Sequence, residues 1–201
     1  QPPELTVTLD DQTNVLCYNA ATGAINVTVA GGVMPAGGYI YTWIGSDYLG
    51  TYFTSSSEDL TGLKAGTYNL TVRDNNGCVA ILPAVTITQS TQFIVTRDSQ
   101  INVLCHDAAT GEIEVSVTGG VTPYGYSWTG TNYLGVPFSS NDEDLSGLTA
   151  GTYLLTVTDD NGCSVILPVV NITQPADLTV TLLSVNNVFC HDAATGAINV
   201  S

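Results

Sequence analysis

Residues 66–78 read Gly-Thr-Tyr-Asn-Leu-Thr-Val-Arg-Asp-Asn-Asn-Gly-Cys, and this stretch decides the fold class. Tyr68, Leu70 and Val72 alternate with polar residues, and a period of two is typical of a strand with one buried face. The Asp-Asn-Asn-Gly that follows predicts a tight hairpin, because Asn and Gly tolerate a positive φ. A strand that ends in such a turn indicates an antiparallel sheet.

A closely similar stretch returns at residues 151–163, and other motifs return in the same order. Asn14-Val15-Leu16-Cys17 recurs at residues 102–105 and, with phenylalanine in place of leucine, at residues 187–190. Such self-similarity predicts tandem copies of one structural unit. We expect a first repeat over residues 1–88, a second over 89–174, and the truncated start of a third over 175–201. We expect the chain to be a segment of a longer tandem array.

Each complete repeat carries about seven short stretches with strand and turn signals, and neither has an extended helical period. Trp43 and Trp128 are the expected core aromatics. Tyr68 and its counterpart Tyr153 follow a Leu-X-Gly-Leu corner, where a tyrosine hydroxyl commonly bonds back to upstream backbone. The prediction is an all-β fold of tandem immunoglobulin-like β-sandwich repeats joined end to end. A closed all-β barrel is the alternative.

The charge balance restricts the partners. Three Lys and Arg residues stand against 18 Asp and Glu residues, which gives a net charge of −15. Such a chain cannot neutralise a run of phosphates, so we expect neither nucleic acid nor an anionic membrane surface as a partner. No apolar run approaches the roughly 18 residues that membrane insertion needs. The expected partners are neighbouring repeats of the same chain, with extracellular glycans or surfaces as further candidates.

The cysteines recur at fixed positions in the repeat, two in each complete copy, which fits an oxidising compartment. The simplest pairing joins Cys17 to Cys78 and Cys105 to Cys163, and leaves Cys190 unpaired in this segment. That pairing requires the segment before Cys17 to run back along the sandwich, since the two cysteines of a repeat would otherwise lie at opposite ends. Pairing between neighbouring repeats (Cys78–Cys105 and Cys163–Cys190) and free thiols are the alternatives.

The ordered motifs of one repeat resemble the SprB-type repeat, found in large surface adhesins of gliding Bacteroidota. The carrying residues are Cys17, Gly23-Ala24-Ile25, Gly31-Gly32, Tyr41-Thr42-Trp43, Leu60-Thr61-Gly62-Leu63, Ala65-Gly66-Thr67-Tyr68, residues 74–78 and Ile87-Thr88-Gln89. The resemblance covers both complete copies and the stub. It implies export by the type IX route, display on the outer cell surface, and a role in adhesion or filament formation with a link to gliding.

Acidic clusters recur in the predicted loops and suggest calcium as the one candidate cofactor. The candidate ligands are Asp59 and Asp74 with their counterparts Asp144 and Asp159. Carboxylate oxygens grouped on loops suit Ca²⁺. The ordinary interpretation is that these acids serve turn geometry through their own side-chain hydrogen bonds. No other cofactor is expected.

Tyr48 and Tyr133 occupy matching loops and are candidate glycan-stacking residues, with packing at the sandwich edge as the ordinary interpretation. No residue pattern suggests catalysis, because the candidate acids are duplicated with the scaffold, whereas an active site is usually single. We therefore expect no enzyme activity.

The predicted function is structural. The chain would be a stalk segment of a large secreted bacterial surface adhesin, acting as a stiff spacer or filament with a connection to gliding motility. Two alternatives remain: an array of carbohydrate-binding modules, or accessory spacer domains of a secreted hydrolase.

Overall fold

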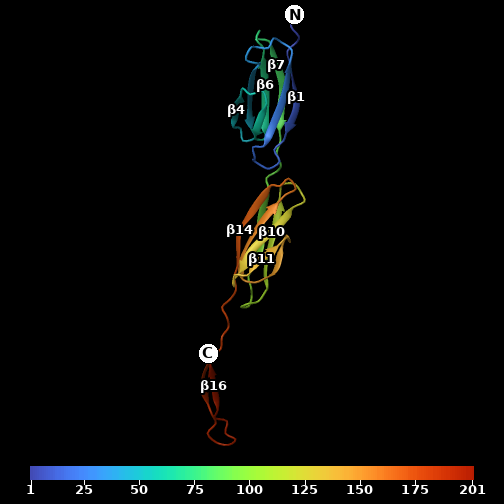
Figure 1. Cartoon of the computed structure of the whole chain (residues 1–201). Helices are drawn as coiled ribbons and strands as arrows, with labels where there is room; N and C mark the ends of the chain where they lie inside the picture. Colours follow the sequence, from blue (N-terminus) through green and yellow to red (C-terminus); the bar gives the residue numbers. More distant parts are fainter. The chain divides into compact units, whose positions relative to one another are not determined.

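The computed structural model describes residues 1–201, and all its regular elements are strands (Figure 1). The first seven strands are β1 (Thr6–Thr13), β2 (Gly23–Ala30), β3 (Ile40–Asp47), β4 (Tyr52–Ser55), β5 (Leu60–Leu63), β6 (Gly66–Arg73) and β7 (Val79–Ile87). The next seven are β8 (Ile94–Ile101), β9 (Gly111–Thr118), β10 (Gly125–Asn132), β11 (Pro137–Ser140), β12 (Leu145–Leu148), β13 (Gly151–Thr158) and β14 (Ser164–Ile172). The last two are β15 (Leu182–Asn186) and β16 (Ala197–Val200). The structure holds no helix that could cross a membrane.

The first seven strands form two sheets, in the orders β1-β2-β5 and β4-β3-β6-β7. The next seven repeat this arrangement as β12-β9-β8 and β11-β10-β13-β14. In the first repeat, buried side chains from both sheets form one core, which includes Ile25 of β2, Trp43 of β3 and Leu70 of β6. A three-stranded sheet packed on a four-stranded sheet is an immunoglobulin-like sandwich, so the predicted fold class is confirmed.

The two tryptophans lie at the centre of the sandwiches, as predicted. Trp43 and Trp128 are almost fully buried. The indole nitrogen of Trp43 donates to the carbonyl oxygens of Ser57 and Glu58 at 3.0 and 3.3 Å. Trp128 makes the corresponding bonds in the second repeat. Each indole therefore buries its rings without leaving its N–H group unsatisfied.

The corner before the central strand of each four-stranded sheet is fixed by a tyrosine, again as predicted. The hydroxyl of Tyr68 donates to the carbonyl oxygen of Lys64 at 2.8 Å. The hydroxyl of Tyr153 donates to the carbonyl oxygen of Thr149 at the same distance. Each tyrosine is buried in its strand, β6 or β13, and its hydroxyl fixes the backbone of the turn that precedes the same strand.

A double glycine follows β2 and β9 because the backbone of another segment passes very close to it. Gly31 has a φ of 78°, and a Cβ atom there would lie 1.8 Å from the carbonyl oxygen of Glu4. Gly119 has a φ of 74°, and its Cβ atom would lie 1.7 Å from the carbonyl oxygen of Gln92. Only glycine fits this conformation and this contact.

The chain divides into two compact units. One contains Gln1–Thr96, Ser116–Ser127 and Thr156–Leu167, and the other contains Arg97–Val115, Trp128–Leu155 and Pro168–Ser201. No sheet mixes strands of the first seven with strands of the next seven. The units therefore do not coincide with the predicted repeats, whose boundaries at residues 88 and 174 remain a prediction.

Candidate functional site

The loop that carries Cys17 is fixed at the end of β7. The N–H of Val15 donates to the carbonyl oxygen of Thr88 at 2.9 Å, and the side-chain oxygen of Asn14 accepts the N–H of Thr88 at 2.9 Å. Val15 is buried, whereas Leu16 points outward and is 56% exposed. The Asn-Val-Leu-Cys motif thus has a structural explanation, in which the first two residues anchor the loop and the last two are presented on its outside.

A glutamine completes this anchor. The side-chain oxygen of Gln89 accepts the N–H of Asn19 at 2.8 Å. Asn19 has a φ of 60°, a conformation that Asn and Asp tolerate better than other residues with a Cβ atom. In the second repeat Gln174 accepts the N–H of Asp107, whose φ is 59°, at 3.0 Å. We call this element the cysteine loop, residues 14–20 and 102–108.

The second cysteine of each repeat follows a hairpin that is organised by a buried aspartate. One oxygen of Asp74 accepts the N–H groups of Asn76 and Cys78 at 2.9 and 2.8 Å. Its other oxygen accepts the N–H of Val33 at 2.9 Å. Hydrogen bonds from these backbone N–H groups lower the pKa of Asp74 below its usual value, and the bond from Val33 has the largest effect. The hairpin, residues 74–78, is thereby bonded to the segment after β2.

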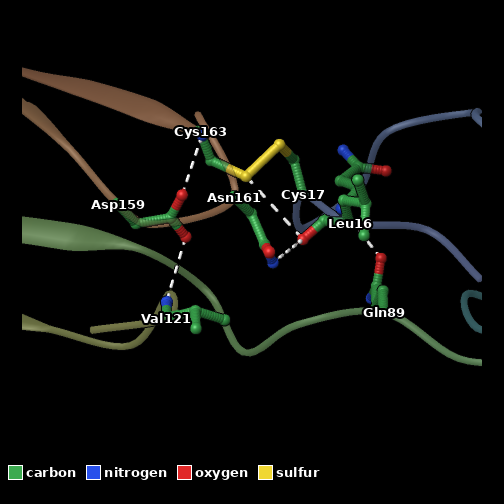
Figure 2. The surroundings of a disulfide bond; sticks show 8 residues. Leu16, Cys17, Gln89, Val121, Asp159, Asn161 and Cys163 are labelled. Carbon is green, nitrogen blue, oxygen red and sulfur yellow. Dashed lines mark hydrogen bonds between the residues drawn. A yellow bond between two sulfur atoms is a disulfide. The ribbon is translucent and has the colours of Figure 1, made fainter. Parts of the chain in front are cut away.

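The second repeat uses the same device, shown in Figure 2. Asp159 accepts the N–H of Val121 at 3.0 Å with one oxygen and the N–H of Cys163 at 2.8 Å with the other. Asp159 is 5% exposed and Asp74 is 3% exposed. We call this element the acidic hairpin, residues 74–78 and 159–163.

The cysteine loop and the acidic hairpin lie at opposite ends of one sandwich. Cys78 directly precedes β7, whereas the loop of Cys17 is bonded to Thr88 and Gln89, directly after β7. Strand β7 has nine residues and therefore spans about 30 Å. A disulfide requires Cα atoms within about 7 Å. The predicted pairing of Cys17 with Cys78 is therefore wrong, and β14 separates Cys105 from Cys163 in the same way.

The observed disulfide joins Cys17 to Cys163, with their Cα atoms 5.6 Å apart (Figure 2). It connects the cysteine loop of the first repeat to the acidic hairpin of the second, and both residues belong to the same compact unit. Cys78, Cys105 and Cys190 are unpaired and exposed. The alternative pairing of Cys78 with Cys105 and of Cys163 with Cys190 is therefore wrong as well.

Polar contacts surround this bond. The side-chain nitrogen of Asn161 donates to the carbonyl oxygen of Leu16 at 3.2 Å. The sulfur of Cys163 lies 3.7 Å from the same oxygen, but it carries no proton in the disulfide and cannot donate. Cys163 is buried, although its counterpart Cys78 is exposed. The hairpin thus meets the loop through a covalent bond, a hydrogen bond and burial of Cys163.

The candidate calcium ligands are not gathered at one point. Asp59 accepts the N–H of Val27 at 2.9 Å, and Asp144 accepts that of Val115 at 2.8 Å, whereas Asp74 and Asp159 organise the hairpins. No group of three or more His, Cys, Asp or Glu side chains lies together in a way that could hold a metal ion. All four acids act as acceptors for backbone N–H groups. Calcium binding remains a prediction.

The candidate glycan-stacking tyrosines lie beside the cysteine loops. Tyr48 contacts Tyr18 edge to face, with ring centroids 5.8 Å apart, and its pKa is raised chiefly by desolvation. The hydroxyl of Tyr133 donates to Asp107, and this hydrogen bond is the main reason that its pKa is raised. Both rings are partly exposed. Glycan binding there remains a prediction.

Sequence reasoning missed the role of Gln89 and Gln174, although it recognised that the two cysteines of a repeat lie at opposite ends unless the segment before Cys17 runs back along the sandwich. A signal was present, because a Thr-Gln pair follows the last strand of each repeat at the same position. The strand between the two cysteine-bearing elements also has enough residues to rule out a bond across it.

Comparison with known proteins confirms the resemblance. The family model described as the SprB repeat matches residues 9–47 and 98–132. These two regions include both cysteine loops and the tryptophan strands β3 and β10. Residues 9–47 and 98–132 therefore match the SprB repeat, in agreement with the resemblance. No curated protein matches the sequence.

Solved structures resemble the chain only distantly. Three N-terminal domains of the highly immunogenic outer capsid protein of bacteriophage RB49 are 17% identical, with a TM-score of 0.41, covering 98% of this chain and 69% of that one. A tetra-tandem repeat in the extending region of a large adhesion protein is 18% identical, with a TM-score of 0.34, covering 92% and 53%. Fibronectin(III)-like modules of Clostridium thermocellum CbhA are 14% identical, with a TM-score of 0.31, covering 84% and 93%.

Proposed function

We propose that the chain is a load-bearing spacer segment of a surface-exposed, adhesin-like protein. The observation that carries this proposal is the Cys17–Cys163 bond, which joins residues 146 positions apart. A tension applied between the two ends of the chain would pass through this bond. Residues 18–162, which include β2 to β13, would lie outside the loaded path. Their strands would then need no mechanical strength of their own to keep the segment from lengthening.

Extracellular display is the setting that this proposal requires. Disulfides persist in oxidising environments and are rare in the cytosol. The SprB-type repeats support outer-surface display, and we extend this to export by the type IX route and a connection to gliding. The net charge of −15 favours solubility and repels acidic neighbours.

The proposed function involves no catalysis. The duplicated acids have a structural use in both repeats, since each accepts backbone N–H groups. The partners would be neighbouring repeats of the same chain, with extracellular glycans or surfaces as further candidates.

Pulling on single molecules from the two termini tests the proposal. Opening the bond frees residues 18–162, and a sequence separation of 146 corresponds to at most about 500 Å of extended chain. We expect the fully stretched chain to be longer by about this amount after reduction with a phosphine, and in a Cys17→Ser variant without reductant. A Cys190→Ser variant is the matched control and should behave as the parent. Equal stretched lengths with and without reductant would contradict the proposal.

A further inference from the structure

The acidic hairpin of the first repeat is built like the one that is bonded, yet its cysteine is unpaired. Asp74 holds the N–H of Cys78 at 2.8 Å, the distance at which Asp159 holds the N–H of Cys163. Asp74 also accepts the N–H of Val33 as Asp159 accepts that of Val121. The backbone of Cys78 is therefore held by the same hydrogen bonds as that of Cys163, which forms a disulfide.

A surface hollow lies beside Cys78. It has a volume of about 410 Å³ and is lined by Gln1, Pro2, Pro3, Glu4, Leu5, Gly32, Asp74, Cys78 and Val79. Its lining combines apolar side chains and a thiol with the polar Gln1, the acidic Glu4 and the buried acid of the hairpin. At the corresponding hairpin of the second repeat, Cys163 is buried and Asn161 contacts the backbone of Leu16.

The cysteine loop of the second repeat, which carries Cys105, is the element that such a hairpin would bind. The N–H of Val103 donates to the carbonyl oxygen of Thr173 at 2.9 Å, and the N–H of Ala108 donates to the carbonyl oxygen of Cys105 at 3.1 Å. The first repeat has the same two bonds, from Val15 and Ala20, at the same distances. Leu104, at the position of Leu16, is 73% exposed. The loop of Cys105 is thus preformed for an acidic hairpin.

We propose that the Cys78 end of the first repeat is a docking face for the cysteine loop of another copy of this repeat. Asn76 would donate to the backbone carbonyl of the leucine in that loop, as Asn161 does to that of Leu16, and a disulfide would close the contact beside the hollow. This inference concerns the end of the repeat and does not depend on the adhesin-like role.

The covalent step is a thiol–disulfide exchange with a small disulfide oxidant such as oxidised glutathione. One thiolate attacks the oxidant and releases one reduced glutathione, and the second thiolate attacks the mixed disulfide and releases the other. Two thiols thus lose two protons and two electrons, and one oxidised glutathione becomes two reduced molecules.

The test places a copy of residues 89–173 directly before Gln1 of the full chain, because Gln1 corresponds to Gln174. The copy carries Ile101→Val as a mass label and Cys163→Ser, so Cys105 is its only cysteine. After equilibration in a glutathione buffer, peptide mapping without reduction should find Cys78 linked to Cys105 of the copy. Near-ultraviolet circular dichroism checks that the copy is folded, and the Cys17–Cys163 bond is the internal standard.

Two outcomes would overturn the proposal: Cys78 remains open to alkylation in the folded chain, or it pairs with Cys190. Unfolding in urea should abolish the selective link, which separates docking from chance oxidation. An Asn76→Ala variant should lower the equilibrium constant for the Cys78 link about fivefold, as expected for one lost hydrogen bond. Asn75→Ala is the matched control and should leave the constant unchanged.

Discussion

Asp74 and Asp159 are acids that recur in the sequence, and each fixes the hairpin that carries the second cysteine of its repeat. Each is buried in a hairpin and accepts backbone N–H groups from two segments of the chain. The recurrence of these acids was visible in the sequence. Their burial was not, because a carboxylate in an Asp-Asn-Asn-Gly turn is ordinarily solvated. The N–H groups of Val33 and Val121 come from a distant loop, and only the tertiary structure supplies them.

The acid stability of the first repeat should depend on Asp74. Its pKa in the folded chain is lower than the usual 3.8, so protonation favours the unfolded state. The stability from this group is complete above about pH 4 and is lost as the pH falls through the lower folded value. We predict that Asp74→Asn lowers the free energy of unfolding at neutral pH and lowers it less in acid.

Urea unfolding at a series of pH values between about 7 and about 2.5 measures the difference in free energy of unfolding between parent and Asp74→Asn. The exposed Asp11→Asn is the matched control. The gap between parent and Asp74→Asn should shrink as the pH falls below 4. A gap of constant size would contradict the assignment.

At the scale of elements, the sequence predicted the strands better than their pairing. The alternation of Tyr68, Leu70 and Val72 identified β6, and each of these residues is buried. In the sheets, Trp43 lies opposite Leu70, a pairing that no local pattern indicates. Strand β1 shows little alternation of burial and its register with β2 shifts between Leu9 and Asp11. Periodicity alone could not locate that irregularity.

The tyrosine corners should contribute equally to the two repeats. Tyr68→Phe and Tyr153→Phe each remove one hydrogen bond to a backbone carbonyl and keep the packed ring. We predict a loss of about 1 kcal/mol in the free energy of unfolding for each. Tyr52→Phe, at a ring that is 73% exposed, is the control. Chemical denaturation checks the values, and a loss no larger than that of the control would contradict the role of the corner.

Gln89 should act on the disulfide through the loop that it holds. Gln89→Ala removes the acceptor for the N–H of Asn19 and leaves the loop of Cys17 less constrained. We predict that the equilibrium constant for the Cys17–Cys163 bond in a glutathione buffer falls about fivefold. Gln92→Ala is the control, because Gln92 is exposed outside the anchor. An unchanged constant for Gln89→Ala would show that the anchor does not position Cys17.

At the scale of the whole molecule, the sequence predicted repeated sandwiches but assigned the cysteines to the wrong partners. Two cysteines in each repeat suggested a bond within it. The position of each cysteine depends on which end of the sandwich its loop occupies, and that is set by the anchor at Gln89 and by the length of β7. Neither feature is local to Cys17 or Cys78, so the pairing required the folded chain.

The disulfide connectivity is the claim on which the spacer proposal depends. Peptide mapping of the oxidised chain without reduction, with free thiols blocked beforehand, measures it directly. The account predicts one linked pair, Cys17 with Cys163, and alkylated Cys78, Cys105 and Cys190. A linked pair of Cys17 with Cys78, or of Cys105 with Cys163, would contradict it.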